Sequence, residues 1–234
     1  ETGGSIDAPH TAPKIEQLIG LLWDIGLDIG HSVRSVKQCL EEADRDITVK
    51  TSLLEARYLA GSQSLCNSLI QSCNAELDPA DFFKAKRLEQ AERYARFNDT
   101  LYSLEPNCKE NPGGRRDLQV IQWVARASGI GNQWKALAKS GLVTTAEVRQ
   151  FERADQFLTE LRIELHLLVG RREDRLLFDY QENLAQALGI AATESKRASE
   201  VLMQRYYQNA KLVTQLNALT MQVLADRLLP ARLG

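Results

Sequence analysis

Asp28 is the carboxylate whose surroundings best suit a divalent cation. It stands within residues 26–33 (GLDIGHSV), where apolar residues alternate with small or polar ones at the two-residue period of a strand. On that pattern Asp28 points away from the core between Gly26 and Gly30, and its hard oxygen donors could coordinate Mg²⁺. A solvent-facing carboxylate on a one-sided strand explains the same pattern, and one carboxylate does not make a two-metal site. The pattern alone leaves both interpretations open.

A second group of residues suits an anion. Residues 112–117 (PGGRRD) combine two glycines, which let a backbone approach a ligand closely, with two arginines at the start of an expected helix. Guanidinium groups bind phosphate in a bidentate way, so Gly113, Gly114 and Arg116 are candidate phosphate-binding residues. A simple turn in which Arg116 and Asp117 form ion pairs is supported equally well.

Other motifs carry weaker signals. Residues 44–46 (DRD) have the spacing of a carboxylate pair but follow a helix, where acidic clusters are usually solvated, and residues 3–5 (GGS) lack the preceding strand of a phosphate-binding turn. His166 lies in an apolar helical seam and is expected to be a packing residue. The sequence contains no His-Asp dipeptide, Walker loop, Rossmann fingerprint or G-x-S-x-G motif. An independent enzyme site is therefore hard to assemble from these residues alone.

Helical periodicity dominates the elements that would position these residues, which predicts a mainly α protein. Turn-forming residues interrupt it over residues 101–116, and a loop of that length in a helical protein is usually functional. We expect a small α/β part over residues 1–60 and a helical bundle over residues 61–234. The expected strands are residues 26–33 and 47–49. The expected helices are residues 14–23, 36–43, 52–60, 65–73, 81–98, 117–127 and 134–140, a long one from 145, a shorter one ending near 189, and 195–229.

The composition is that of a globular protein. The chain has 234 residues, of which 26% are charged and 44% hydrophobic. Its formal net charge is −2, so its overall charge does not attract nucleic acid or an anionic membrane. No apolar run approaches a membrane span, and the four cysteines have no C-x-x-C spacing, so we expect a cytoplasmic protein with reduced, mostly buried thiols. Residue 1 is Glu, and the two methionines are Met203 and Met221, so we expect a processed chain or a fragment.

Several blocks resemble one family, the bacterial PII uridylyltransferase, also called the uridylyl-removing enzyme. They occur in the family's order over most of residues 20–215. The blocks are residues 22–34 (LWDIGLDIGHSVR), 46–49 (DITV), 54–57 (LEAR), 102–107 (YSLEPN), 112–114 (PGG), 116–118 (RDL) and 175–179 (RLLFD).

The resemblance implies a bifunctional nitrogen sensor. In that family a polymerase-β-like nucleotidyltransferase domain moves UMP from UTP onto a tyrosine of the PII signal protein, an HD domain removes it, and ACT domains sense glutamine. Transfer uses Mg²⁺ held by a D-x-D pair and a third carboxylate. The resemblance implies that Asp28 is this third carboxylate, with Asp46 as the second choice, and that Arg34, Lys109 and Arg116 stabilise phosphate charge.

The resemblance also implies which parts lie elsewhere. The family's D-x-D strand would precede residue 1, and its HD and ACT regions would follow residue 234, so residues 1–60 are expected to be the later part of the transferase domain. Arg115 departs from the family pattern, in which a leucine usually follows the glycines. Two alternatives stay open: an enzyme similar to the glutamine synthetase adenylyltransferase, and a non-catalytic helical interaction module.

Overall fold

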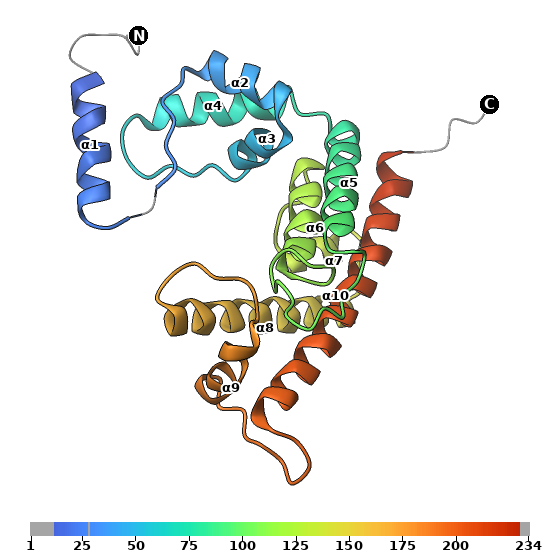
Figure 1. The fold of residues 1–234 in the computed structure, drawn as a ribbon. Helices are drawn as coiled ribbons and strands as arrows, with labels where there is room; N and C mark the ends of the chain where they lie inside the picture. The colour runs from blue at the N-terminus through green and yellow to red at the C-terminus, as the bar shows by residue number, and fades with distance from the viewer. Residues whose placement is uncertain (1–11, 28, 230–234) are drawn as a thin grey trace. The chain divides into compact units, whose positions relative to one another are not determined.

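The computed structural model describes residues 12–27 and 29–229, and the chain divides into two compact units. Unit 1 is Glu1–Glu76 and unit 2 is Leu77–Gly234. In the described ranges every regular element is a helix (Figure 1). Unit 1 contains α1 (Ala12–Asp24), α2 (Val36–Arg45), α3 (Ile47–Leu54) and α4 (Gln63–Ala75). Unit 2 contains α5 (Pro79–Arg96), α6 (Arg115–Ala127), α7 (Trp134–Lys139), α8 (Thr145–Val169), α9 (Phe178–Ala187) and α10 (Ala198–Leu228).

In unit 1, helices α2, α3 and α4 pack against one another. Polar side chains begin each of them. Ser35 and Gln38 form a reciprocal capping box at α2, the Asp46 side chain caps α3, and the Ser62 side chain caps α4. These caps satisfy backbone N–H groups that have no partner inside the first turn.

The predicted strand over residues 47–49 is wrong, because these residues form the first turn of α3. One Asp46 carboxylate oxygen accepts hydrogen bonds of 2.7 Å from both the backbone N–H and the hydroxyl of Thr48. Thr51 donates its hydroxyl to the Ile47 carbonyl. The cap and these local bonds outweigh the strand preference of β-branched residues. The predicted helix over 52–60 is also wrong in extent, since α3 ends at Leu54.

The strand expected over residues 26–33 is not found either. Asp28 itself lies outside the described residues, and the described residues on either side of it, 27 and 29–35, form neither helix nor strand. The alternation of apolar and small residues requires neighbouring strands to become a sheet, and none of the described residues provides one. The mainly α prediction is confirmed, whereas the α/β part has no strand in the described residues.

Helix α8 carries the predicted apolar seam through unit 2. Its seam residues, which have no exposed surface, are Phe151, Ala154, Leu158, Leu161 and Leu165. A capping box of Thr144 and Glu147 begins the helix, and Gly170 ends it in the left-handed conformation. Helices α6, α7, α9 and α10 all contact α8, so this seam is the centre of the bundle.

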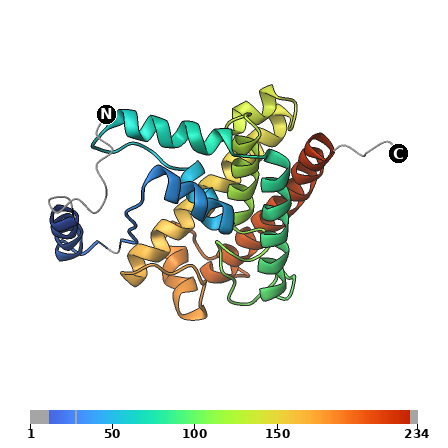
Figure 2. The ribbon, with the colours of Figure 1, turned by 90° about the horizontal axis from the view of Figure 1, so that it is seen from above.

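Helix α10 is the longest element, with 31 residues. It contacts α5, α6, α8 and α9, and Figures 1 and 2 show α5 and α10 side by side. One face is buried along its whole length, including Leu202, Tyr206, Ala210, Val213 and Leu224. None of the helices within the described ranges is long and apolar enough to cross a membrane.

Candidate functional site

The loop that joins α5 to α6 is held by its own side chains. The Asn107 side-chain oxygen accepts hydrogen bonds from the backbone N–H groups of Lys109 and Glu110, and the Asn111 side-chain oxygen accepts one from the backbone of Asn107. Both asparagines replace turn hydrogen bonds that the backbone cannot make by itself. The predicted interruption of helical structure over residues 101–116 is therefore an ordered loop that ends where α6 begins.

This loop is joined to a segment about 70 residues later in the chain. The backbone of Cys108 donates to the Asp174 carbonyl at 2.8 Å, and the backbone of Leu176 donates to the Pro106 carbonyl at 2.9 Å. Asn107 and Arg175 form an isolated antiparallel bridge between the two stretches. The motif blocks at residues 102–107 and 175–179 thus form one structural unit.

Asp174 joins the two segments through its side chain as well. Its carboxylate accepts a hydrogen bond of 2.7 Å from Arg162 and lies 3.3 Å from the His166 ring nitrogen. Partial burial acts to raise the pKa of Asp174, but the hydrogen bond and charge of Arg162, together with His166, lower it below its ordinary value. His166 therefore contacts a charged partner, and its partly exposed side chain lies beside the buried α8 seam, contrary to the prediction that it is a packing residue within the seam.

The two glycines of the loop are packed against protein backbone. Gly113 has a φ of +77°, and a Cβ there would lie 2.7 Å from the Ala210 Cα on α10. A Cβ on Gly114 would lie 2.7 Å from the Lys109 carbonyl oxygen. Because glycine has no Cβ, Gly113 can pack directly against the backbone of α10.

Asp117 lies at the centre of a buried polar network. It has no exposed surface, and its carboxylate accepts hydrogen bonds from Arg93 (2.6 Å), Tyr94 (2.7 Å), Gln90 (3.2 Å) and the Gly113 backbone (2.7 Å). Burial, followed by the charge of Asp117, raises the pKa of the Tyr94 hydroxyl, which therefore stays protonated and donates. The network ties the later end of the loop, at Gly113, and the start of α6 to α5.

Asn217 connects the same network to α10. Its side-chain nitrogen donates to the Asp117 carbonyl at 3.0 Å, and its oxygen accepts from Gln90 at 2.9 Å. Sequence reasoning missed Gln90, Arg93 and Asn217 as part of this site. The available signal was the row of long polar residues Lys86, Gln90 and Arg93, whose spacing of four and three places them on one face of α5.

Lys109 and Arg116 share a single acidic partner. Arg116 donates to the Glu110 carboxylate at 2.9 Å, and the Lys109 ammonium lies 3.5 Å from the same oxygen. Burial acts to raise the pKa of Glu110, but the neighbouring Arg116 and Lys109 lower it below its ordinary value. The Arg116 guanidinium also lies 5.3 Å from the centre of the Trp123 ring. The ion-paired alternative for Arg116 and Asp117 is thus present in the structure, and the Lys109 charge acts on Asp174 as well as on Glu110.

The remaining predicted site residues belong to unit 1. Asp28 lies outside the described residues, Asp46 caps α3, and Arg34 is exposed just before α2. Residues 31–33 and α1 line a hollow of about 340 Å³. The structure places Lys109, Gly113 and Gly114 in one loop and Arg116 in the first turn of α6, where Lys109 and Arg116 meet at Glu110. It brings no three His, Cys, Asp or Glu side chains of the described ranges into a group that could hold a metal ion.

The chain is similar to proteins of one family. The family model described as GlnD PII-uridylyltransferase matches residues 81–221, more than half of the chain. A protein of Bordetella parapertussis named bifunctional uridylyltransferase/uridylyl-removing enzyme is 57% identical over 94% of this chain and 25% of its own length. Proteins of the same name are 55% identical in Aromatoleum aromaticum and 54% identical in Nitrosospira multiformis, over 94% and 93% of this chain and 26% and 24% of theirs. The chain therefore spans about a quarter of the length of these relatives. No solved structure matches it.

Proposed function

The chain belongs to the GlnD PII-uridylyltransferase family, and from that membership we propose that it is part of an enzyme that transfers UMP from UTP to a tyrosine of the PII protein. The relatives are named for both transfer and removal of the uridylyl group, so the proposed parent protein is bifunctional. It would also contain an HD domain for removal and ACT domains for glutamine sensing, and it would act in the cytoplasm.

One observation supports a role of this chain near the reaction. The family match at residues 81–221 contains both the loop after α5 and the segment at 174–178, which the structure joins through backbone hydrogen bonds. The joined segments, the buried Asp117 and the packed glycines hold Lys109 and Arg116 in place. A cation held in a fixed position stabilises phosphate charge better than a mobile one.

We assign roles to individual residues on that basis. Lys109 and Arg116 bind the phosphates of UTP, which compete with the Glu110 carboxylate for the same two cations. Gly113 and Gly114 shape the loop that presents these cations. Arg34, in unit 1, is proposed as a further phosphate-binding residue.

The described residues do not supply a set of Mg²⁺ ligands. No three acidic, His or Cys side chains in the ranges that the structure describes form a group suited to a metal. The oxygen of Asp46 that caps α3 already accepts two hydrogen bonds from Thr48. We therefore assign no step to a metal on these residues. The proposal that Asp28 is a Mg²⁺ ligand rests on the family resemblance.

The proposal is tested first by titrating the chain with UTP and with ATP, each with Mg²⁺, in an isothermal calorimeter. We expect UTP to bind and ATP to bind at least about tenfold more weakly, because the family is a uridylyltransferase. Preference for ATP would contradict the uridylyl assignment and favour the adenylyltransferase alternative. Binding of PII without either nucleotide, together with no nucleotide binding, would favour an interaction module.

The role of Arg116 is tested in the full-length parent protein with PII and labelled UTP. We expect Arg116→Ala to lower the rate of UMP transfer about 10- to 100-fold, because a charged contact to phosphate is lost. Arg149→Ala is the matched control, since Arg149 is exposed on α8 outside the loop. Equal rates for the two variants would remove Arg116 from the proposed site.

A further inference from the structure

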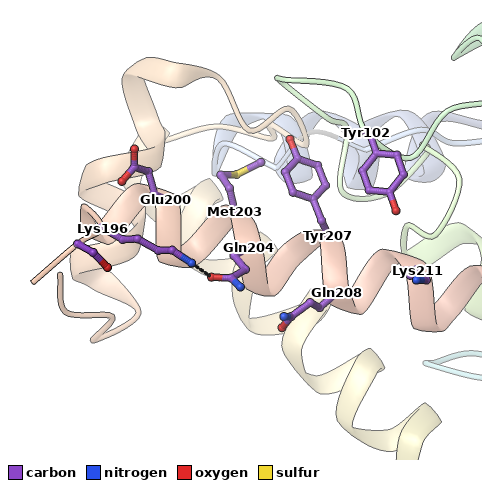
Figure 3. Close-up of a pocket in the computed structure, with 9 residues that line it drawn as sticks. Tyr102, Lys196, Glu200, Met203, Gln204, Tyr207, Gln208 and Lys211 are labelled. Atoms are coloured by element: carbon purple, nitrogen blue, oxygen red, sulfur yellow. Dashed lines mark hydrogen bonds between the residues drawn. The ribbon is translucent and has the colours of Figure 1, made fainter. Parts of the chain in front are cut away.

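A second concave surface lies on the first half of α10. It is a groove of about 690 Å³, drawn in Figure 3. Most of its lining comes from one face of α10, and Tyr102 from the loop forms one wall. The residues that line it are Tyr102, Ser195, Lys196, Glu200, Met203, Gln204, Tyr207, Gln208 and Lys211.

The floor of this groove is apolar and held in position. The Tyr207 hydroxyl donates to the Ser103 carbonyl at 2.8 Å, and the rings of Tyr102 and Tyr207 have centres 5.8 Å apart. Figure 3 shows both rings and the Met203 thioether along the same stretch of α10. Tyr102 is 61% exposed, although the backbone of its loop is fixed. Aromatic and thioether groups fixed in this way suit an apolar or aromatic side chain of a partner.

The charge around the floor is positive at both ends. Lys196 donates to the neutral side-chain oxygen of Gln204 at 2.7 Å, and Lys211, at the other end, has no ion pair among the described residues. Glu200 is the acidic residue of the lining, and it already accepts hydrogen bonds from the backbone and guanidinium of Arg197. Neither ammonium group forms an ion pair among the described residues, although the charge of Lys196 also acts on Glu200, so both groups can pair with acidic groups from outside the chain.

The spacing of the two ammonium groups sets the geometry of a complementary segment. The Lys196 ammonium is hydrogen-bonded to the Gln204 side chain. Gln204 precedes Lys211 by seven residues, so the two ammonium groups are separated by about 10 Å along the helix axis. In an extended peptide, side chains at positions 1, 3 and 5 share one face, and the outer two lie about 13 Å apart. Flexible lysine side chains can adjust to that difference.

We propose that this groove docks an extended segment of a partner protein in which an aromatic residue lies between two acidic residues, each two positions away. The aromatic side chain lies on Met203 and the two tyrosines, and the acidic side chains pair with Lys196 and Lys211. None of the residues that line this groove has a role in the proposed nucleotide chemistry, so the docking proposal does not depend on that chemistry.

The probe is a capped heptapeptide of sequence Gly-Glu-Ser-Phe-Ser-Glu-Gly, titrated into the 234-residue chain. We expect binding that weakens as sodium chloride rises from 50 to 500 mM, because exposed charge pairs are screened. The same peptide with lysines in place of the glutamates, or with glycine in place of the phenylalanine, is expected to bind at least about fivefold more weakly. Equal binding of all three peptides would overturn the proposal.

Variants of the chain test the same contacts from the other side. We expect Lys211→Glu and Tyr102→Ala each to weaken binding at least about fivefold, with Lys135→Glu as a control of equal charge change on the exposed face of α7. Equal weakening by Lys211→Glu and Lys135→Glu would overturn the proposal. Tighter binding of a thymidine hexanucleotide than of the peptide would overturn it in favour of a nucleic acid. Dimerisation of the chain that Lys211→Glu abolishes would overturn it in favour of a second copy.

Discussion

Each carboxylate oxygen of Asp117 accepts two hydrogen bonds, one pair from Gln90 and Arg93 and the other from Tyr94 and the Gly113 backbone. A buried carboxylate costs little free energy only when its oxygens are fully hydrogen-bonded and its charge is paired. Both conditions are met here. The position of the loop therefore depends on a charge at residue 117 as well as on its size.

Asp117→Asn tests that dependence. The change keeps the size but removes the nearer of the two carboxylates that pair with the Arg93 guanidinium, which is 3% exposed; the other, Glu110, lies 3.9 Å away. We expect the free energy of unfolding to fall by about 3–5 kcal/mol, measured by urea denaturation. Asp155→Asn is the control, because its pair with Arg115 is partly exposed and should be worth about 1 kcal/mol or less. Similar decreases in the free energy of unfolding for both variants would mean that burial does not make the Asp117–Arg93 pair more important for stability than an exposed pair.

The packing of Gly113 can be separated from its backbone conformation. Gly113 and Gly170 have similar φ values, +77° and +71°, but a Cβ would meet the Ala210 backbone at Gly113 and open space at Gly170. We expect Gly170→Ala to cost about 1–2 kcal/mol for the left-handed conformation. Gly113→Ala should cost roughly 1–3 kcal/mol more, because the loop must move away from α10. Equal midpoints of thermal unfolding for the two variants would show that the loop does not depend on this contact.

At the scale of elements, periodicity predicted most helices because apolar residues recur in them at helical spacing, although α1 and α4 contain no fully buried residue. The α8 seam repeats apolar residues at three and four positions, and α4, α5, α6 and α7 lie where that pattern placed them. The failure at residues 47–49 has a local cause as well. An aspartate followed two residues later by a threonine is a helix-capping pattern, and it decides the conformation of a short β-branched run.

The candidate site was only partly predictable. The glycines, Lys109 and Arg116 were visible in the loop sequence, and the structure does place them together. The contact between Cys108 and Asp174 joins residues far apart in the chain, and no local pattern encodes such a pairing. The buried partners of Asp117 were missed because long polar residues on a helix normally face solvent.

Asp174 gives the junction between the two segments a defined pH dependence. Its pKa in the folded chain lies below the ordinary value of 3.8, mainly because of Arg162. The folded state then binds fewer protons than the unfolded state near that pH, so the stabilising effect is present above about pH 4 and is lost as pH falls through the lowered pKa. The Lys109 charge and His166 act in the same direction.

We expect Asp174→Asn to lower the free energy of unfolding by about 1 kcal/mol at pH 7, since the charged hydrogen bond is partly exposed. The difference from the unmodified chain should shrink as the pH is lowered below about 4, measured by urea denaturation at each pH. Glu194→Gln, at an exposed position, is the control and should give no such trend. A difference that stays constant down to pH 2 would rule out the charge of Asp174 as the cause.

At the scale of the whole molecule, the buried core is unevenly divided. Among the described residues, the buried apolar side chains of unit 1 are Ala43 and Leu54, whereas those of unit 2 run along α6, α8 and α10. Burial of apolar surface is the main stabilising contribution in folding, so the two units should differ in local stability.

Hydrogen exchange followed by mass spectrometry measures this difference. We expect peptides from α6, α8 and α10 to exchange slowest, and peptides from α2, α3 and α4 to exchange at least about tenfold faster, because fewer apolar contacts protect their hydrogen bonds. The comparison uses the 234-residue chain at neutral pH. Protection of unit 1 equal to that of α8 would contradict a division of stability between the units.

The length of α10 between two of its contacts sets their relative orientation. Gly113 packs against Ala210, and Asn217 donates a hydrogen bond to the Asp117 carbonyl. Residues 210 and 217 of α10 are seven residues apart, close to two full turns. Deleting one residue between them would turn the second position by about 100° around the helix axis and separate it from its partner. The number of residues between positions 210 and 217 therefore sets both their distance along the helix and their relative direction around its axis. A substitution on the exposed side of α10 leaves both contacts in place, whereas a deletion between residues 210 and 217 breaks one of them.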